Sequence, residues 1–264
     1  MKKYIVIGNP IEHSLSPKLH SYWFKKYGVD AIYEKVQVLD TELEQVISKI
    51  KKGEIYGANV TVPHKSKVIK YLDNLSKDAE KTQSVNTIYK KNGKIYGDNT
   101  DTIGFEQSLF ENLSSVKNKN ILILGAGGVT PSVIHVLKKL EVNKISISNR
   151  TRENAEKLKE NFSNIDVVNW GDTPLVDFII NTTSVGLKSD DLINIDYDKI
   201  GTNKFYYDVI YKPSKTNFLL EAEKRGNKIE NGKLMFIYQA QKAFEIWHNI
   251  KPEVNKEVKD LLDD

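Results

Sequence analysis

The feature of this sequence that most constrains its fold is a continuous apolar run ending in a cluster of glycines. Ile121–Leu124 leads into Gly125-Ala-Gly-Gly128, and apolar residues at helical spacing then run from Val133 to Leu140. This order predicts a strand, a tight turn and a helix. Glycines allow close backbone approach, and a helix N-terminus presents unpaired N–H groups to an anion. The segment therefore predicts a dinucleotide phosphate site; from these residues alone, a plain glycine turn stays open as the alternative.

The following strand indicates which dinucleotide is bound. Ile145–Ser148 ends in Asn149-Arg-Thr-Arg152, with no acidic residue at its tip. An NAD site normally carries an acid there for the ribose 2′-hydroxyl, whereas a 2′-phosphate is matched by a guanidinium. Arg150 and Arg152 therefore favour NADP. The alternative is that both arginines are solvated residues at a helix start, with Thr151 as its N-cap.

Periodicity elsewhere predicts two successive α/β series. In the first, the expected strands and helices are Lys3–Gly8, Pro17–Tyr27, Ile32–Val38, Thr41–Ile50 and Ile55–Val62, followed by a hairpin of Val85–Tyr89 and Lys94–Tyr96 around Asn92-Gly93. In the second, further strands are expected at Lys144–Ser148, Asp166–Val168, Phe178–Asn181 and Phe205–Val209. Helices are expected at the junction, Asp101–Leu113, and near the C-terminus, Met235–Trp247 and Val254–Leu262. The first series predicts a parallel sheet with the hairpin at its edge.

Composition excludes several classes of protein. A chain of 264 residues is long enough for two domains, and its 39% hydrophobic and 28% charged residues are typical of globular proteins without a membrane span. There are no cysteines, which excludes disulfides and thiolate chemistry and is compatible with the cytoplasm. The net charge of +4 is spread along the chain, so a nucleic-acid partner is not expected. His13, His20 and His64 lack the spacing of a metal site, and no metal is expected.

Two hydroxyls near the N-terminus are candidates for binding a carboxylate. Ser14 and Ser16 precede an expected helix that has Pro17 in its first turn. Hydroxyls at a helix N-terminus bind anions well. Plain capping, with Ser16 as the N-cap, is the reading that these residues favour by themselves.

The order of motifs along the whole chain resembles the shikimate dehydrogenase family. The motifs that carry this resemblance are Gly8-Asn-Pro-Ile-Glu-His-Ser-Leu-Ser-Pro17, Asn59-Val-Thr-Val-Pro-His-Lys65, Ser84-Val-Asn-Thr87, Asn99-Thr-Asp101, Gly125-Ala-Gly-Gly128, Asn149-Arg-Thr151, Asn181-Thr-Thr-Ser184, Asp208-Val-Ile-Tyr211 and Tyr238-Gln-Ala240. The resemblance implies an NADPH-dependent enzyme that reversibly reduces 3-dehydroshikimate to shikimate, in the biosynthesis of aromatic amino acid precursors. It also implies a small-molecule partner and no membrane or nucleic-acid partner; a monomer or a homodimer is expected.

The resemblance also assigns roles to individual residues. It implies that Lys65 and Asp101 are the catalytic pair. It implies that the substrate is held by Ser14, Ser16, Asn59, Thr61, Asn86, Tyr211 and Gln239. It implies that the cofactor is held by Gly125, Ala126, Gly127, Gly128, Asn149, Arg150, Thr151, Arg152, Val209 and Gly232. An ammonium can protonate the oxygen that becomes negative during hydride transfer, which suits Lys65, and a carboxylate can orient it.

Three departures from the family pattern are visible. Ser21 follows His20 where the family usually has Asn, and a valine stands in Thr182-Thr-Ser-Val-Gly186 where small residues are common. Val129-Thr-Pro-Ser132 replaces a stretch that usually contains a basic residue, which puts phosphate affinity in doubt.

The resemblance implies two α/β lobes with a cleft between them. The expected substrate domain is 1–101 joined by the C-terminal helices 238–264, and the expected Rossmann-like NADP domain is 102–237. Two alternatives stay open: a quinate/shikimate dehydrogenase of broader specificity or with a preference for NAD, and a non-catalytic sensing module that binds NADPH or shikimate.

Overall fold

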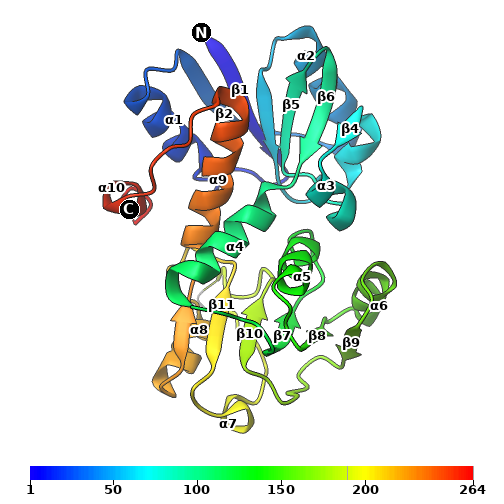
Figure 1. Ribbon diagram of the computed structural model, residues 1–264, viewed down its shortest axis with the longest axis vertical. Coiled ribbons are helices and arrows are strands. Elements are labelled where there is room, and N and C mark those ends of the chain that lie inside the picture. Colours follow the sequence, from blue (N-terminus) through cyan, green and yellow to red (C-terminus); the bar gives the residue numbers. More distant parts are fainter. Residues whose placement is uncertain (189, 264) are drawn as a thin grey trace. The chain divides into compact units, whose positions relative to one another are not determined.

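The computed structural model describes residues 1–188 and 190–263 and shows an α/β protein with two six-stranded sheets (Figure 1). The chain divides into two compact units. Unit 1 comprises Met1–Gln107 and Ile237–Asp264, and unit 2 comprises Ser108–Phe236. The boundaries fall inside two helices, α4 (Thr100–Asn112) and α9 (Lys233–His248). The α/β class predicted from the sequence is confirmed. In the described part of the chain, no helix combines the length and apolar character that crossing a bilayer requires.

The sheet of unit 1 has the strand order β2-β1-β3-β5-β6-β4. Its strands are β1 (Lys2–Gly8), β2 (Ala31–Gln37), β3 (Gly57–Val60), β4 (Asn74–Leu75), β5 (Thr87–Lys91) and β6 (Lys94–Asp98). β1 is parallel to β2 and β3, whereas β5 is antiparallel to β3 and β6. The prediction that the β5–β6 hairpin forms the sheet edge was wrong. The two-residue β4 pairs with β6 outside it, and a strand this short leaves no periodic signal.

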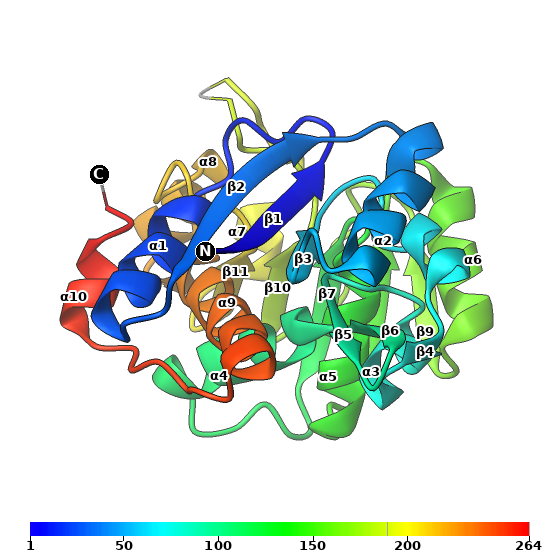
Figure 2. The same ribbon diagram turned by 90° about the horizontal axis from the view of Figure 1, so that it is seen from above.

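The two faces of this sheet are covered by different helices. Ile5 and Ile7 of β1 face a core built with α2 (Leu43–Lys52), whose apolar residues recur at helical spacing. Tyr4, on the opposite face, contacts the aromatic rings of Phe24 in α1 (Ser16–Lys26) and Trp247 in α9. Figure 2 shows α2 on one side of β1 and β3, with α1 and α9 on the other. The last helix of unit 1 is α10 (Lys256–Asp260).

Besides β4, two short elements that follow β3 in unit 1 were not predicted from the sequence. They are a 3-10 turn (Lys67–Tyr71) and the helix α3 (Lys77–Thr82). Each is too short to establish a period. α3 is nonetheless well formed, because the Ser76 hydroxyl accepts a hydrogen bond from the Ala79 N–H and caps it.

The sheet of unit 2 is entirely parallel and has the order β12-β11-β10-β7-β8-β9. Its strands are β7 (Asn120–Leu124), β8 (Lys144–Ser148), β9 (Ile165–Val168), β10 (Phe178–Asn181), β11 (Phe205–Asp208) and β12 (Lys228–Glu230). The connecting helices are α5 (Thr130–Lys139), α6 (Arg152–Asn161), α7 (Tyr197–Ile200) and α8 (Asn217–Lys224). Strand order reverses between β7 and β10, as in doubly wound dinucleotide-binding folds, where ligands bind at the carboxyl ends of these two strands.

A buried histidine lies within the aromatic layer of unit 1. The ring of His20 stacks on Tyr33 with centroids 4.4 Å apart and also contacts Trp23, Phe244 and Trp247. Its side chain is fully buried, and neither ring nitrogen has a hydrogen-bond partner among the described residues. Burial in this apolar environment, together with the nearby His248, lowers the pKa of His20 to about 3.

This histidine predicts a pH dependence of stability. An unfolded chain protonates His20 near pH 6.5, whereas the folded protein resists protonation until about pH 3. Stability should therefore fall as the pH drops between these values, by about 1.4 kcal/mol per pH unit from this residue. Urea unfolding at several pH values checks this. The variant His20→Phe should show a slope that is shallower by about that amount, and equal slopes would contradict the prediction.

Candidate functional site

The strand register of unit 1 gathers polar side chains at one end of its sheet. Asn59 on β3 lies opposite Thr87 on β5, which in turn lies opposite Asp98 on β6. Lys65 follows β3 in the chain, and Asp101 lies in the first turn of α4, directly after β6. Residues that are distant in sequence are therefore brought to one edge by strand pairing.

Lys65 and Asp101 form an ion pair at this edge. The Lys65 ammonium donates to Asp101 Oδ2 over 2.5 Å, and the two side chains are only 12% and 8% exposed. Asp101 Oδ1 also accepts a hydrogen bond from the Asn86 amide at 2.9 Å. A pair this buried is costly to form unless further hydrogen bonds support it. The geometry therefore holds a proton donor next to a fixed carboxylate.

The amide of Asn86 joins several segments of unit 1. Its Oδ1 accepts from the Thr100 N–H at 2.7 Å and thereby fixes the start of α4. Its Nδ2 has three acceptors in range: Thr100 Oγ1 and Asp101 Oδ1 at 2.9 Å, and Gln239 Oε1 of α9 at 3.3 Å. Because an amide has only two N–H groups, at most two of these bonds exist together. The Gln239 contact is the longest, so it is the one that a ligand hydroxyl would displace most easily.

Ser14 and Ser16 interact with each other and do not cap α1. The helix begins at Ser16 with Leu15 in the N-cap position, and no side chain supplies a capping bond. The reading of Ser16 as a plain N-cap was therefore wrong. Ser14 Oγ donates to Ser16 Oγ at 3.2 Å and accepts from the Ser16 N–H at 3.3 Å. The two hydroxyls form a small polar site at the beginning of the helix.

Asn59 and Thr61 differ in how much hydrogen-bonding capacity they retain. Asn59 is 5% exposed, and its Nδ2 donates to the Asn86 carbonyl and to Thr87 Oγ1, both at 3.0 Å. This leaves Asn59 only an acceptor on Oδ1 for a ligand. Thr61 is half-buried, and its hydroxyl makes no hydrogen bond to the described residues, so it can both donate and accept.

In unit 2, the glycine turn lies at the point where strand order reverses. Gly125 follows β7 with φ at +110°, and a Cβ there would meet Thr182 Oγ1, directly after β10, at 2.7 Å. Only glycine combines this conformation with this approach. The turn is thus built for close backbone packing at the position where this fold class binds dinucleotide phosphates.

Side chains hold the backbone of this turn. Asn149 Oδ1 accepts from the Ala126 N–H at 3.1 Å, and the buried Thr130 hydroxyl accepts from the Gly127 N–H at 3.1 Å. Thr130 also contacts Thr182 Oγ1 at 2.9 Å. The departure Val129-Thr-Pro-Ser132 therefore supplies a hydroxyl that supports the loop. The structure shows no basic side chain from this stretch.

Arg150 and Arg152 are in different situations. Arg152 is bound to Glu156 at 3.0 Å, to Asn169 Oδ1 at 3.0 Å and to the Val167 carbonyl at 3.3 Å. Arg150 is exposed and makes no hydrogen bond or ion pair with the described residues. Thr151 lies in the N-cap position of α6 without a side-chain capping bond. Arg150 is therefore the more available guanidinium.

A buried carboxylate organises the segment after β11. Asp208 is fully buried, and its Oδ1 accepts from Asn181 Nδ2 and the Ile210 N–H, both at 3.0 Å. Thr216 donates to Oδ2 at 2.6 Å. Burial raises the pKa of Asp208 to about 6 although these hydrogen bonds oppose the shift.

The segment after Asp208 contains Val209 and Tyr211. A Cβ on Gly232 would lie 2.0 Å from the Val209 carbonyl oxygen, so only glycine permits this approach. The Tyr211 ring contacts Phe236 with centroids 4.7 Å apart.

Sequence reasoning gave no role to several residues that complete these networks. In unit 1 they are Tyr33, Thr87 and Thr100, and in unit 2 they are Thr130, Asn181, Asp208 and Thr216. Most of them lie inside or beside the quoted motifs, and this position was the only indication in the sequence that they belong to the site. Tyr33 lies in an ordinary strand pattern and carried none. Over residues 1–188 and 190–263, no group of three or more histidines and acids is arranged to hold a metal ion.

Comparison with protein families covers most of the chain. Residues 6–88 match a family described as shikimate dehydrogenase substrate binding domain, and residues 107–184 match one described as shikimate / quinate 5-dehydrogenase. A shikimate dehydrogenase (NADP(+)) of Pelagibacter ubique is 56% identical over 262 residues, which cover 99% of each chain.

Solved structures give the same result. One is a shikimate dehydrogenase in complex with NADP+, with a TM-score of 0.93 and 38% identity, covering 99% of this chain and 94% of that one. Another is a shikimate 5-dehydrogenase of Listeria monocytogenes in complex with shikimate and NAD, with a TM-score of 0.91 and 32% identity, covering 99% of this chain and 96% of that one.

Proposed function

The chain belongs to the shikimate dehydrogenase family, and we propose that it catalyses the reversible NADPH-dependent reduction of 3-dehydroshikimate to shikimate. The product is a precursor of aromatic amino acids. We also propose that the protein acts in the cytoplasm. We expect a monomer or a homodimer, and sedimentation measurements distinguish these two oligomeric states. The proposal also includes the division of labour between units, with unit 1 binding substrate and unit 2 binding cofactor.

The observation that carries the proposal is the buried ion pair of Lys65 and Asp101. NADPH, when bound, supplies the hydride. The carbonyl oxygen of the substrate then gains negative charge, and the Lys65 ammonium is the group that protonates it. Asp101 orients the ammonium and accepts a hydrogen bond from a substrate hydroxyl. In the oxidative direction Lys65 takes the proton back.

The remaining polar groups of unit 1 account for the shape of shikimate, a ring that bears one carboxylate and several hydroxyls. The Ser14 and Ser16 hydroxyls bind the carboxylate, and Tyr211 contributes near it. Thr61, Asn86 and Gln239 bind ring hydroxyls, while Asn59 serves as an acceptor only, since both its N–H groups are used within the protein.

The residues of unit 2 fit a dinucleotide. Gly125, Ala126, Gly127 and Gly128 form the turn that receives the pyrophosphate; the positive φ of Gly125 and the lack of room for a Cβ beside Thr182 support this role. Asn149, Arg150, Thr151 and Arg152 bind the adenosine phosphate, with Arg150 as the main charge. Val209 and Gly232 line the nicotinamide end.

Turnover tests the function directly. Purified protein is mixed with shikimate or quinate and with NADP+ or NAD+, and the absorbance of the reduced nicotinamide is followed. Fast reduction with shikimate and NADP+ is the expected result. Equal turnover of quinate, or a preference for NAD+, would assign the protein to the broader-specificity branch. Shikimate binding without turnover in any combination would indicate a sensing module.

Replacing Lys65 tests the proton donor. Lys65→Ala should lower kcat by about 10²–10⁴-fold, because general acid catalysis is lost, while shikimate still binds. Steady-state kinetics and calorimetric binding measure the two effects. Lys67→Ala is the matched control, since Lys67 is also ion-paired, to Asp40 at 2.6 Å, but is 44% exposed. An active Lys65→Ala enzyme would remove Lys65 from the mechanism.

Replacing the two arginines tests the choice of cofactor. Arg150→Gln should raise KM for NADP+ by about 10–100-fold, because a charge-assisted hydrogen bond to the 2′-phosphate is lost. KM for NAD+ should be unchanged. Arg152→Gln should have a smaller effect, because this guanidinium is already bound to Glu156 and β9. A larger effect at Arg152 would reverse the assignment.

A further inference from the structure

Tyr33, on β2, is a buried tyrosine whose ring and hydroxyl face different environments. The ring is stacked on His20, with an interplanar angle of 6°, and also contacts Trp247. The side chain is only 6% exposed. The aromatic layer therefore fixes the ring, and the hydroxyl oxygen is the only polar atom of the Tyr33 side chain.

The hydroxyl is bonded to one group of the proposed substrate site. It donates to Asn59 Oδ1 at 2.6 Å, the shortest hydrogen bond that Asn59 makes. Burial raises the pKa of Tyr33 well above its usual value, so the phenol keeps the proton that it donates.

The Asn59 amide is held from both sides. Tyr33 donates to its Oδ1, and its Nδ2 donates to Thr87 Oγ1 and to the Asn86 carbonyl. A donor at Oδ1 and acceptors at Nδ2 leave the Asn59 amide one favourable orientation, since the flipped amide would place N–H groups against the phenol proton.

We propose that Tyr33 is a positioning residue of the substrate site, which fixes the orientation of the Asn59 amide. The inference rests on the proposed function. Tyr33 touches neither substrate nor cofactor in this account. It sets the direction of a group that binds a ring hydroxyl, so its loss should weaken substrate binding and spare the chemical step.

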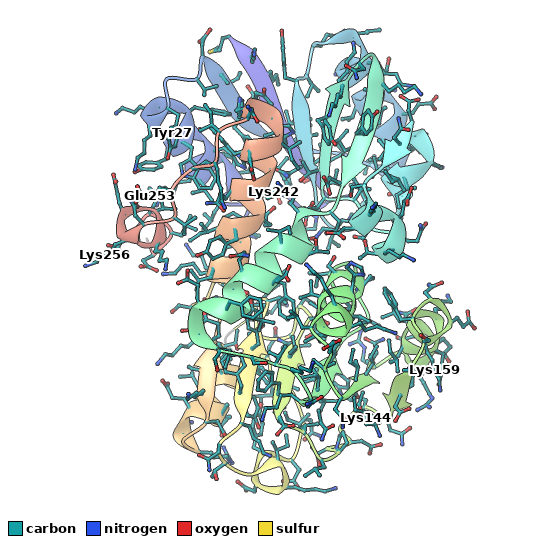
Figure 3. All side chains as sticks on the ribbon, viewed as in Figure 1. Tyr27, Lys144, Lys159, Lys242, Glu253 and Lys256 are labelled. Atoms are coloured by element: carbon teal, nitrogen blue, oxygen red, sulfur yellow. The ribbon has the colours of Figure 1, made fainter. Side chains whose placement is uncertain are left out.

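The variant Tyr33→Phe tests this by removing one oxygen atom and keeping the stacked ring. We expect KM for shikimate to rise at least about tenfold, with kcat changed less than about threefold and KM for NADP+ unchanged. The matched control is Tyr27→Phe, also in unit 1, whose hydroxyl accepts from the Glu253 N–H at 3.0 Å (Figure 3). It should behave as wild type.

A KM for shikimate within twofold of wild type would overturn the proposal, as would a fall in kcat together with a rise in both KM values. A second pair of variants probes the Asn59 amide from its other end, should Tyr33→Phe fail to fold. Thr87→Val should raise KM for shikimate, and Thr87→Ser, which keeps the acceptor, should restore it; an unchanged KM in Thr87→Val would overturn the proposal. Failure of the proposed function would look different, because the wild-type protein itself would not turn over shikimate.

Discussion

The geometry of unit 1 depends on the side-chain amide of Asn86. Its oxygen holds the first N–H group of α4, and its nitrogen holds the Asp101 carboxylate, so the helix that carries Asp101 cannot rotate independently of β5. Lys65 is bound to the other oxygen of that carboxylate. One buried amide therefore determines the position of an ion pair whose members lie far from each other in sequence.

Buried polar networks of this kind are favourable only when every member is satisfied. In unit 1 the condition is met by short side chains on two neighbouring strands and at the start of α4: Thr87 accepts from Asn59, and Asn86 accepts from Thr100. In unit 2 the same principle appears around Asp208, whose charge is surrounded by an amide, a hydroxyl and a backbone N–H. Each network therefore stabilises the end of a strand and the segment that follows it.

Much of this could be predicted from the sequence, and the rest could not for physical reasons. The apolar run before Gly125 identified β7, and the Asn92-Gly93 dipeptide identified the β5–β6 turn, in which both residues have positive φ. The position of β4 at the sheet edge depends on pairing between segments, which periodicity does not report. The same holds for Tyr33: in sequence it is one aromatic residue in an alternating strand, and its partners come from α1 and β3. Ser16 was misjudged because helix start positions shift by a residue.

Helix α9 returns the chain to unit 1, so that unit is built from two separate stretches of sequence, whereas unit 2 is continuous. During synthesis on the ribosome, all of unit 2 emerges before Phe244 and Trp247 do. Until then the faces of Tyr4 and His20 that these rings cover stay open to water. The order of translation therefore leaves the aromatic layer of unit 1 incomplete until α9 has been made, and the nascent chain exposes this apolar surface until then.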